Sequence, residues 1–134
     1  YLSDEETKTR LLEMKSSGEK MSGFVFSSDG GMIAFISGDG AIEVWDLNTG
    51  TQLQQLTGHE YGVMSLAFSP DGQILASTAA DETIRLWDVK TGVELTVLEG
   101  HSYPVYSAEF SLDGQWIISC SDDGTVRLWG LPDR

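Results

Sequence analysis

The sequence predicts an all-β protein made of three repeats, each a four-stranded antiparallel meander. Two observations predict this fold class. Trp45, Trp87 and Trp129 follow one another at intervals of 42 residues. A Phe-Ser-x-Asp-Gly sequence recurs at the same interval, beginning at Phe26, Phe68 and Phe110. A fixed period of this length is typical of repeat architectures, in which each repeat is one supersecondary unit.

The second repeat shows the expected elements most clearly. Four short runs of apolar or β-branched character predict strands: Val63–Phe68, Ile74–Thr78, Thr83–Trp87 and Val93–Leu98. Glycine-containing turns follow the first and third of these runs, with Asp-Gly at 71–72 and Lys-Thr-Gly at 90–92. Four-stranded units of this length have the size of a propeller blade. We therefore expect β-propeller blades, three of them in this chain.

The repeat register also predicts the organisation of the chain. We expect a partial propeller over residues 1–134, with blade 1 at 16–57, blade 2 at 58–99 and blade 3 at 100–134. Arg134 stands at the position of Gly92, so blade 3 lacks its outer strand. Residues 1–15 are either that missing strand or a short helix. Thr9–Met14 aligns with the outer strand of the first repeat, whereas a capping box at Ser3–Glu6 favours a helix over residues 4–15.

The second repeat resembles the WD-repeat (beta-transducin-like) family over almost every motif position. The matching residues are Gly58-His59, Leu75-Ala76-Ser77, Asp81 and Ile84-Arg85-Leu86-Trp87-Asp88. The third repeat departs from the pattern at Gly130, which replaces the Asp that follows the tryptophan. The first keeps only Asp39 and Trp45-Asp46. The resemblance covers residues 16–134.

The resemblance implies a hydrogen-bonded tetrad in each complete repeat. Its members are His59, Ser77, Asp81 and Trp87 in the second repeat, and His101, Ser119, Asp123 and Trp129 in the third. Each polar group of such a set would cost a few kcal/mol if buried without a partner. In the first repeat Ser17 replaces the histidine and Phe35 replaces the serine. We expect Asp39 and Trp45 to lose their usual partners, and blade 1 to be the loosest blade.

The family resemblance also implies a partner-binding surface on the narrow face of the propeller. Three positions per blade map to Lys20, Ser22, Gly38; Gly62, Met64, Ala80; and Pro104, Tyr106, Asp122. Met64 and Tyr106 are its apolar anchors, and such residue types are enriched at protein interfaces. Tyr61 and Tyr103 extend this surface from the neighbouring loops. The alternative is that these side chains form ordinary surface.

Charge and motif spacing exclude several classes of function. The chain has 8 Lys+Arg against 21 Asp+Glu, for a formal charge of −13. This charge would repel nucleic acid and anionic membranes, and no run approaches the roughly 18 apolar residues that span a bilayer. His59 and His101 lie in separate blades, so they predict neither a catalytic triad nor a metal site. We expect no enzyme activity, metal or cofactor.

The predicted function is a protein–protein interaction scaffold, located in the cytoplasm because no secretory signal opens the sequence. Three blades cannot close a ring, since propellers have typically four to eight. Residues 9–134 make three whole periods shifted by one strand, which favours a homo-oligomer closed head to tail. Two copies with six blades are preferred over three with nine. The alternatives are a purely structural self-assembling ring and a fragment of a larger WD-repeat protein.

Overall fold

The computed structural model describes residues 2–4, 9–11, 13–15, 21–37, 40–59 and 62–132. Within these ranges every regular element is a β-strand. The strands are β1 Leu2–Asp4, β2 Thr9–Leu11, β3 Met21–Phe26, β4 Met32–Ser37, β5 Ile42–Asp46, β6 Thr51–Leu56, β7 Val63–Phe68, β8 Ile74–Ala79, β9 Ile84–Asp88, β10 Glu94–Leu98, β11 Val105–Phe110, β12 Trp116–Ser121 and β13 Val126–Gly130.

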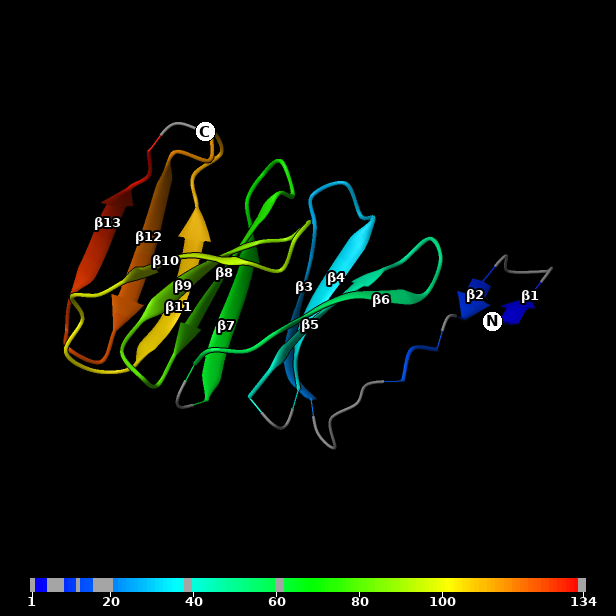
Figure 1. Ribbon diagram of the computed structural model, residues 1–134, viewed down its shortest axis with the longest axis horizontal. Coiled ribbons are helices and arrows are strands. Elements are labelled where there is room, and N and C mark those ends of the chain that lie inside the picture. The colour runs from blue at the N-terminus through cyan, green and yellow to red at the C-terminus, as the bar shows by residue number, and fades with distance from the viewer. Residues whose placement is uncertain are drawn as a thin grey trace.

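Three antiparallel meanders follow one another along the molecule (Figure 1). Blade 1 is the sheet β3-β4-β5-β6, and blade 2 is the sheet β7-β8-β9-β10. Blade 3 is the sheet β11-β12-β13, in which β13 pairs on one side only among the described strands. The predicted fold class, all-β propeller blades with three in this chain, is confirmed.

The Phe-Ser-x-Asp-Gly sequences form the turns between the first two strands of each blade. In blade 2 the Ser69 hydroxyl donates to Asp71 Oδ1 at 2.6 Å, and the same oxygen accepts the backbone N–H of Gln73 at 3.0 Å. Gly72 follows with φ of 73°, a left-handed conformation that costs glycine little. The same serine–aspartate bond forms at Ser27 and Ser111. The recurring sequence is therefore a recurring turn.

The hydrophobic core lies between the blades. One cluster fills the space between blades 1 and 2, and includes Ala34, Ile42 and Val44 of blade 1 with Val63, Phe68 and Leu75 of blade 2. A second cluster fills the space between blades 2 and 3, and includes Ile74, Ala76, Ile84 and Leu86 of blade 2 with Val105, Ala108 and Ile117 of blade 3. Each blade is therefore stabilised by its neighbour, as the repeat architecture requires.

The N-terminal segment forms a separate hairpin, in which β1 pairs with β2 through Ser3 and Arg10. The described part of residues 4–15 is strand at 4 and 9–11 and irregular at 13–15, so the helical alternative is not found there. Pairing of this segment with a third-blade edge stays a prediction, as do the domain boundaries.

Candidate functional site: the blade tetrads and the narrow face

The tetrad of blade 2 is a continuous chain of hydrogen bonds. His59 Nδ1 lies 2.9 Å from Asp81 Oδ2, and His59 Nε2 lies 2.7 Å from the Ser77 hydroxyl. Trp87 Nε1 donates to the same hydroxyl at 2.9 Å. Gly58, which precedes His59, leaves room for the tetrad side chains, since a Cβ there would lie 3.1 Å from the Trp87 ring. The structure thus brings together the four residues that the sequence grouped.

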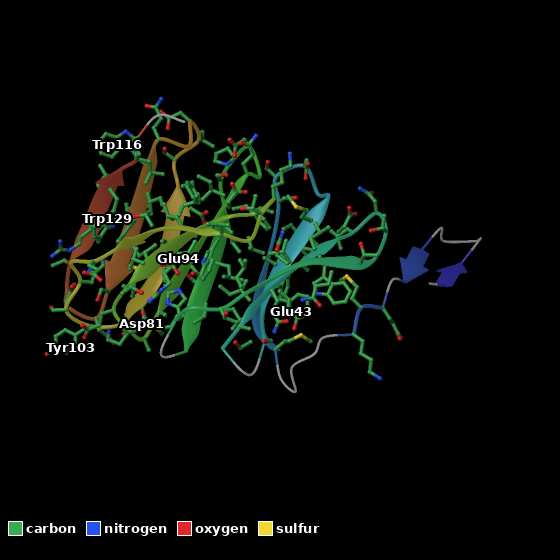
Figure 2. All side chains as sticks on the ribbon, viewed as in Figure 1. Glu43, Asp81, Glu94, Tyr103, Trp116 and Trp129 are labelled. Atoms are coloured by element: carbon green, nitrogen blue, oxygen red, sulfur yellow. The ribbon has the colours of Figure 1, made fainter. Side chains whose placement is uncertain are left out.

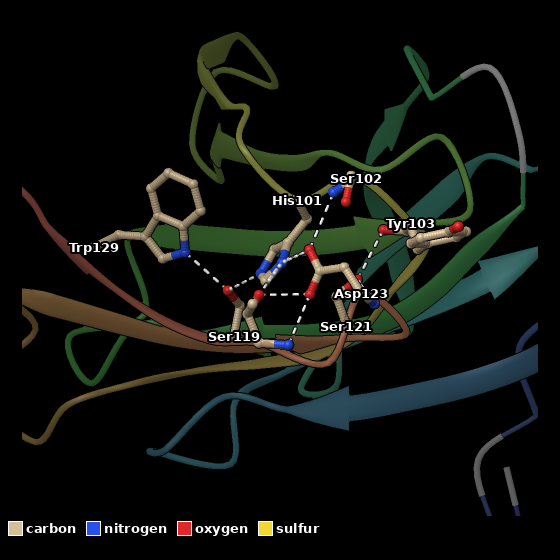
Figure 3. Close-up of polar contacts among 8 residues, drawn as sticks. His101, Ser102, Tyr103, Ser119, Ser121, Asp123 and Trp129 are labelled. Carbon is tan, nitrogen blue, oxygen red and sulfur yellow. Dashed lines mark hydrogen bonds and ion pairs between the residues drawn. The ribbon is translucent and has the colours of Figure 1, made fainter.

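Blade 3 repeats the arrangement (Figure 3). His101 joins Asp123 Oδ2 at 2.8 Å and the Ser119 hydroxyl at 2.8 Å, and Trp129 Nε1 donates to Ser119 at 2.8 Å. Asp123 also accepts the Thr125 hydroxyl and the backbone N–H of Ser102. These donors, Thr125 foremost, hold the pKa of the Asp123 carboxyl far below its ordinary value. Asp123 is therefore an ionised acceptor that ties two loops together.

His59 is a neutral structural group at physiological pH. Its side chain is only 1% exposed, and this burial lowers the pKa of the imidazole below its ordinary value. The hydrogen bond to Asp81 acts in the opposite direction but is the smaller effect. The Ser77 hydroxyl is buried and bonds to both the imidazole and the Trp87 indole. The triad-like grouping is thus a brace within the blade.

Blade 1 replaces the tetrad with a different contact. Trp45 Nε1 donates to Glu43 Oε1 at 3.1 Å, and Glu43 is completely buried. Phe35 stacks on the Trp45 ring with 6.3 Å between ring centroids. Trp45 thus lacks the usual serine partner, as expected, and Glu43 supplies the acceptor that Ser77 provides in blade 2. Ser17 and Asp39 lie outside the described residues.

The loops before each first strand and the turns between the second and third strands carry the residues that the family resemblance assigns to the narrow face. Backbone bonds join these two parts, from Ala80 N to Gly62 O in blade 2 and from Asp122 N to Pro104 O in blade 3. Ser121 adds a hydroxyl bond to Tyr103 O at 2.9 Å. Sequence reasoning did not predict these backbone bonds, which hold the face in a fixed shape.

Large side chains project from this face over blades 2 and 3. Met64 is 42% exposed, Tyr106 is 45% exposed and Tyr103 is 57% exposed. The Tyr106 hydroxyl donates to Asp122 Oδ1, and this bond raises the pKa of the Tyr106 phenol. Figure 2 shows Tyr103 at the same edge of the molecule as Asp81 of the blade 2 tetrad. In blade 3, Tyr106 bonds to Asp122, which precedes the tetrad residue Asp123, and Tyr103 follows the tetrad residue His101 by two positions.

The structure describes only some of the other residues predicted for the narrow face. Ser22 is exposed in β3, beside an open hollow of about 380 Å³ lined by Met21, Phe24 and Phe35. Gly62 is exposed, and Ala80 and Pro104 are half-buried. Lys20, Gly38 and Tyr61 lie outside the described residues. The described part of the face therefore belongs mainly to blades 2 and 3.

Two other kinds of site are absent from the part of the chain that the structure describes. No group of three or more His, Cys, Asp or Glu side chains there is arranged to hold a metal ion. No helix in those ranges has the length and apolar character needed to cross a membrane.

The stacked meanders and their tetrads define a repeat protein of the β-propeller class. Comparison with protein families matches WD40 (WD domain, G-beta repeat) at residues 50–88 and 92–130, together more than half of the chain. The chain belongs to this WD40-repeat family. The two matches run from β6 to β9 and from β10 to β13, and so include both complete tetrads. A search of curated proteins found no match.

Proposed function

We propose that this chain is part of a protein-interaction scaffold that binds a peptide or protein segment on its narrow face through Met64, Tyr103, Tyr106 and Asp122. WD40 repeats generally mediate protein–protein interactions and are generally non-catalytic. The observation that carries the proposal is the cluster of exposed side chains on a braced backbone. Rigid aromatic residues on a fixed surface bind with little loss of conformational entropy.

The chemistry of the face favours a neutral or basic partner. Residues 57–64, 80–83, 100–106 and 121–125 contain neither lysine nor arginine. Glu82 and Asp122 are exposed there, and the Asp122 carboxylate accepts the Tyr106 hydroxyl. An apolar side chain flanked by a cation would complement such a surface, whereas nucleic acid or an anionic membrane would be repelled.

A peptide selected from a displayed random library on the immobilised chain provides the test. Its dissociation constant is then measured in solution by fluorescence anisotropy. We expect Tyr106→Ala and Met64→Ala each to weaken binding at least fivefold, because each removes an anchor. Leu53→Ala is the matched control, since Leu53 is equally exposed but lies on the outer strand β6. Equal binding by all variants would contradict the proposal.

The scaffold also needs further blades on both open sides. Met21, Phe24 and Phe26 are exposed on the outer face of blade 1, and Val126 and Leu128 on the outer face of blade 3. Copies of this chain, two in the preferred arrangement, or blades of another sequence would cover these faces. A ring of identical copies requires the outer face of blade 3 to fit the outer face of blade 1, whereas blades of another sequence do not.

A further inference from the structure

A groove of about 710 Å³ lies between blades 1 and 2, away from the narrow face. It is lined by Gln73, which precedes β8, whereas the narrow-face residue Ala80 follows the other end of the same strand. Both blades that form it are complete four-stranded sheets. A volume of this size is typical of sites that take a ligand. The apolar lining of the groove consists of Met32, Leu53, Ile74, Val89 and Leu95.

The groove has a buried apolar floor and exposed apolar walls. Ile74 and Val89 of blade 2 form the floor, and each is 5% exposed. Leu53 of β6 is 42% exposed, and Leu95 of β10 is 48% exposed. Leu53 stays exposed although the complete blade 2 lies across the groove from it. Leu56 of the same strand, in contrast, is buried in the core between the blades. An apolar hollow between two exposed leucines is typical of a docking surface.

A hydrogen bond between the two blades fixes the shape of the groove. Gln54 Nε2 of β6 donates to the backbone oxygen of Lys90 at 2.9 Å. The Gln54 amide lies over Gly92, where any Cβ would collide with Oε1, and Gly92 has φ of 76°. Asp88 Oδ1 holds the same turn by accepting the backbone N–H groups of Lys90 and Thr91, at 2.9 and 3.3 Å. The turn is therefore tied to the neighbouring blade, and a ligand meets a surface that is already formed.

Lys90 places a positive charge at the groove. Its side chain is exposed and forms no ion pair among the residues that the structure describes. The Asp88 carboxylate also borders the groove, but one of its oxygens is engaged by two N–H groups of the turn. The narrow face over blades 2 and 3 carries exposed Glu82 and Asp122 and neither lysine nor arginine. The groove and the narrow face therefore favour partners of opposite charge.

The overall charge of the chain limits how acidic the partner of the groove can be. The formal charge is −13, which repels a run of acidic residues. A single carboxylate beside Lys90 still gains from the local charge, because physiological salt screens charges that are more than about 8 Å apart. The most complementary ligand is therefore an apolar segment with one acidic residue.

We propose that this groove is a second docking site, which takes a short segment of a partner protein with two or three apolar side chains next to one aspartate or glutamate. The apolar side chains lie between Leu53 and Leu95, and the carboxylate pairs with the Lys90 ammonium. The site shares no residue with the narrow face and does not depend on the function proposed there. A chain with both sites holds two partners of opposite charge.

Binding of defined peptides to the full chain tests the proposal. The probes are fluorescein-labelled ten-residue peptides with a Leu-Ile-Leu core in a Gly-Ser background. One aspartate stands before or after the core, and matched peptides carry lysine in its place. Fluorescence anisotropy gives each dissociation constant. We expect the better aspartate peptide to bind at least fivefold more tightly than its lysine counterpart. Equal binding of the two would overturn the charge assignment.

Two substitutions with matched controls assign the binding to the groove. Leu53→Ala should weaken binding of the aspartate peptide at least fivefold, whereas Leu112→Ala, which removes an exposed leucine of blade 3, should not. Lys90→Glu should reverse the preference from aspartate to lysine. Lys15→Glu makes the same change of charge at another exposed lysine and should leave the preference as it is. Aspartate-peptide binding that neither Leu53→Ala nor Lys90→Glu affects would overturn the proposal.

Two further measurements separate this site from the narrow face and from self-association. Tyr106→Ala should weaken the narrow-face peptide and leave the aspartate peptide unchanged, so the failure of one function is distinguished from the failure of the other. Sedimentation of the wild type and of Leu95→Ala, over a concentration series, tests whether a second copy fills the groove. Equal sedimentation of the two supports a partner of different sequence. Self-association that Leu95→Ala abolishes would assign the groove to a second copy and overturn the proposal.

Discussion

At the residue scale, one serine hydroxyl serves two buried groups in each complete blade. The Ser77 hydroxyl accepts the indole N–H of Trp87 and bonds to His59, and all three side chains are buried or nearly so. Ser77 is therefore the branch point of the tetrad, and Asp81 at its end orients the imidazole through Nδ1. Removing the hydroxyl leaves two polar groups of the blade without a partner.

We predict that Ser77→Ala lowers the free energy of unfolding by about 2–4 kcal/mol, from the cost of two unsatisfied buried groups. Urea denaturation followed by tryptophan fluorescence measures it. Ser28→Ala is the control, because Ser28 is exposed and makes a single hydroxyl bond to Pro70 O. A loss no greater than that of the control would show that the tetrad does not stabilise the blade.

His59 predicts a pH dependence of stability. Its folded pKa lies below the unfolded value because burial disfavours the charged ring, so the unfolded chain takes up the proton at a higher pH. The stabilising contribution is complete above the unfolded pKa of about 6.5 and is lost as the pH falls from there toward the folded pKa. Tm measured between pH 7.5 and pH 5.5 should fall, and His59→Gln should show a shallower dependence. An unchanged slope in the variant would contradict this assignment.

At the element scale, the turns between the second and third strands differ among the blades. Gly40 and Gly124 occupy the left-handed region in blades 1 and 3, with φ of 84° and 82°. Blade 2 has Glu82 at this position, with φ of 73°. A side chain with a Cβ is strained in this region by roughly 1–2 kcal/mol.

Glu82→Gly should therefore stabilise the chain, by about 0.5–1 kcal/mol after the greater freedom of glycine in the unfolded state is subtracted. Thermal unfolding of Glu82→Gly and Glu82→Ala separates the backbone effect from removal of the charge. Only the glycine variant should gain stability, and an equal gain in Glu82→Ala would assign the effect to charge.

The strands were the most predictable part of this molecule. The expected Val63–Phe68 is β7 as the structure has it. The expected strands for β8 and β10 differ by one residue at one end, and the strand for β9 is shifted by one residue at both ends. The strands could be predicted because the turn sequence is repeated three times and because apolar and polar residues alternate along the runs between the turns. The Trp45–Glu43 contact was missed because it replaces a motif instead of repeating it. Glu43 stands at the position of Arg85, and this change of charge was the available signal.

At the scale of the whole molecule, the repeat spacing predicts the tetrads and the narrow-face positions. It does not predict how the outer faces of blades 1 and 3 are covered. Residues that the period aligns can be assigned from sequence, as Ser119 and Ser77 show. What covers these faces depends on side-chain volume and charge across an interface, and the period contains no information on either.

Hydrogen–deuterium exchange of the chain, with and without the library-selected peptide, tests the narrow-face function most directly. We predict slower exchange on peptide binding at residues 62–66, 102–107 and 121–123, which carry Met64, Tyr103, Tyr106 and Asp122. Exchange in the outer strands β6 and β10 should not change. Protection confined to those outer strands, or to β12 and β13 of blade 3, would contradict the account and place the binding surface elsewhere on the propeller.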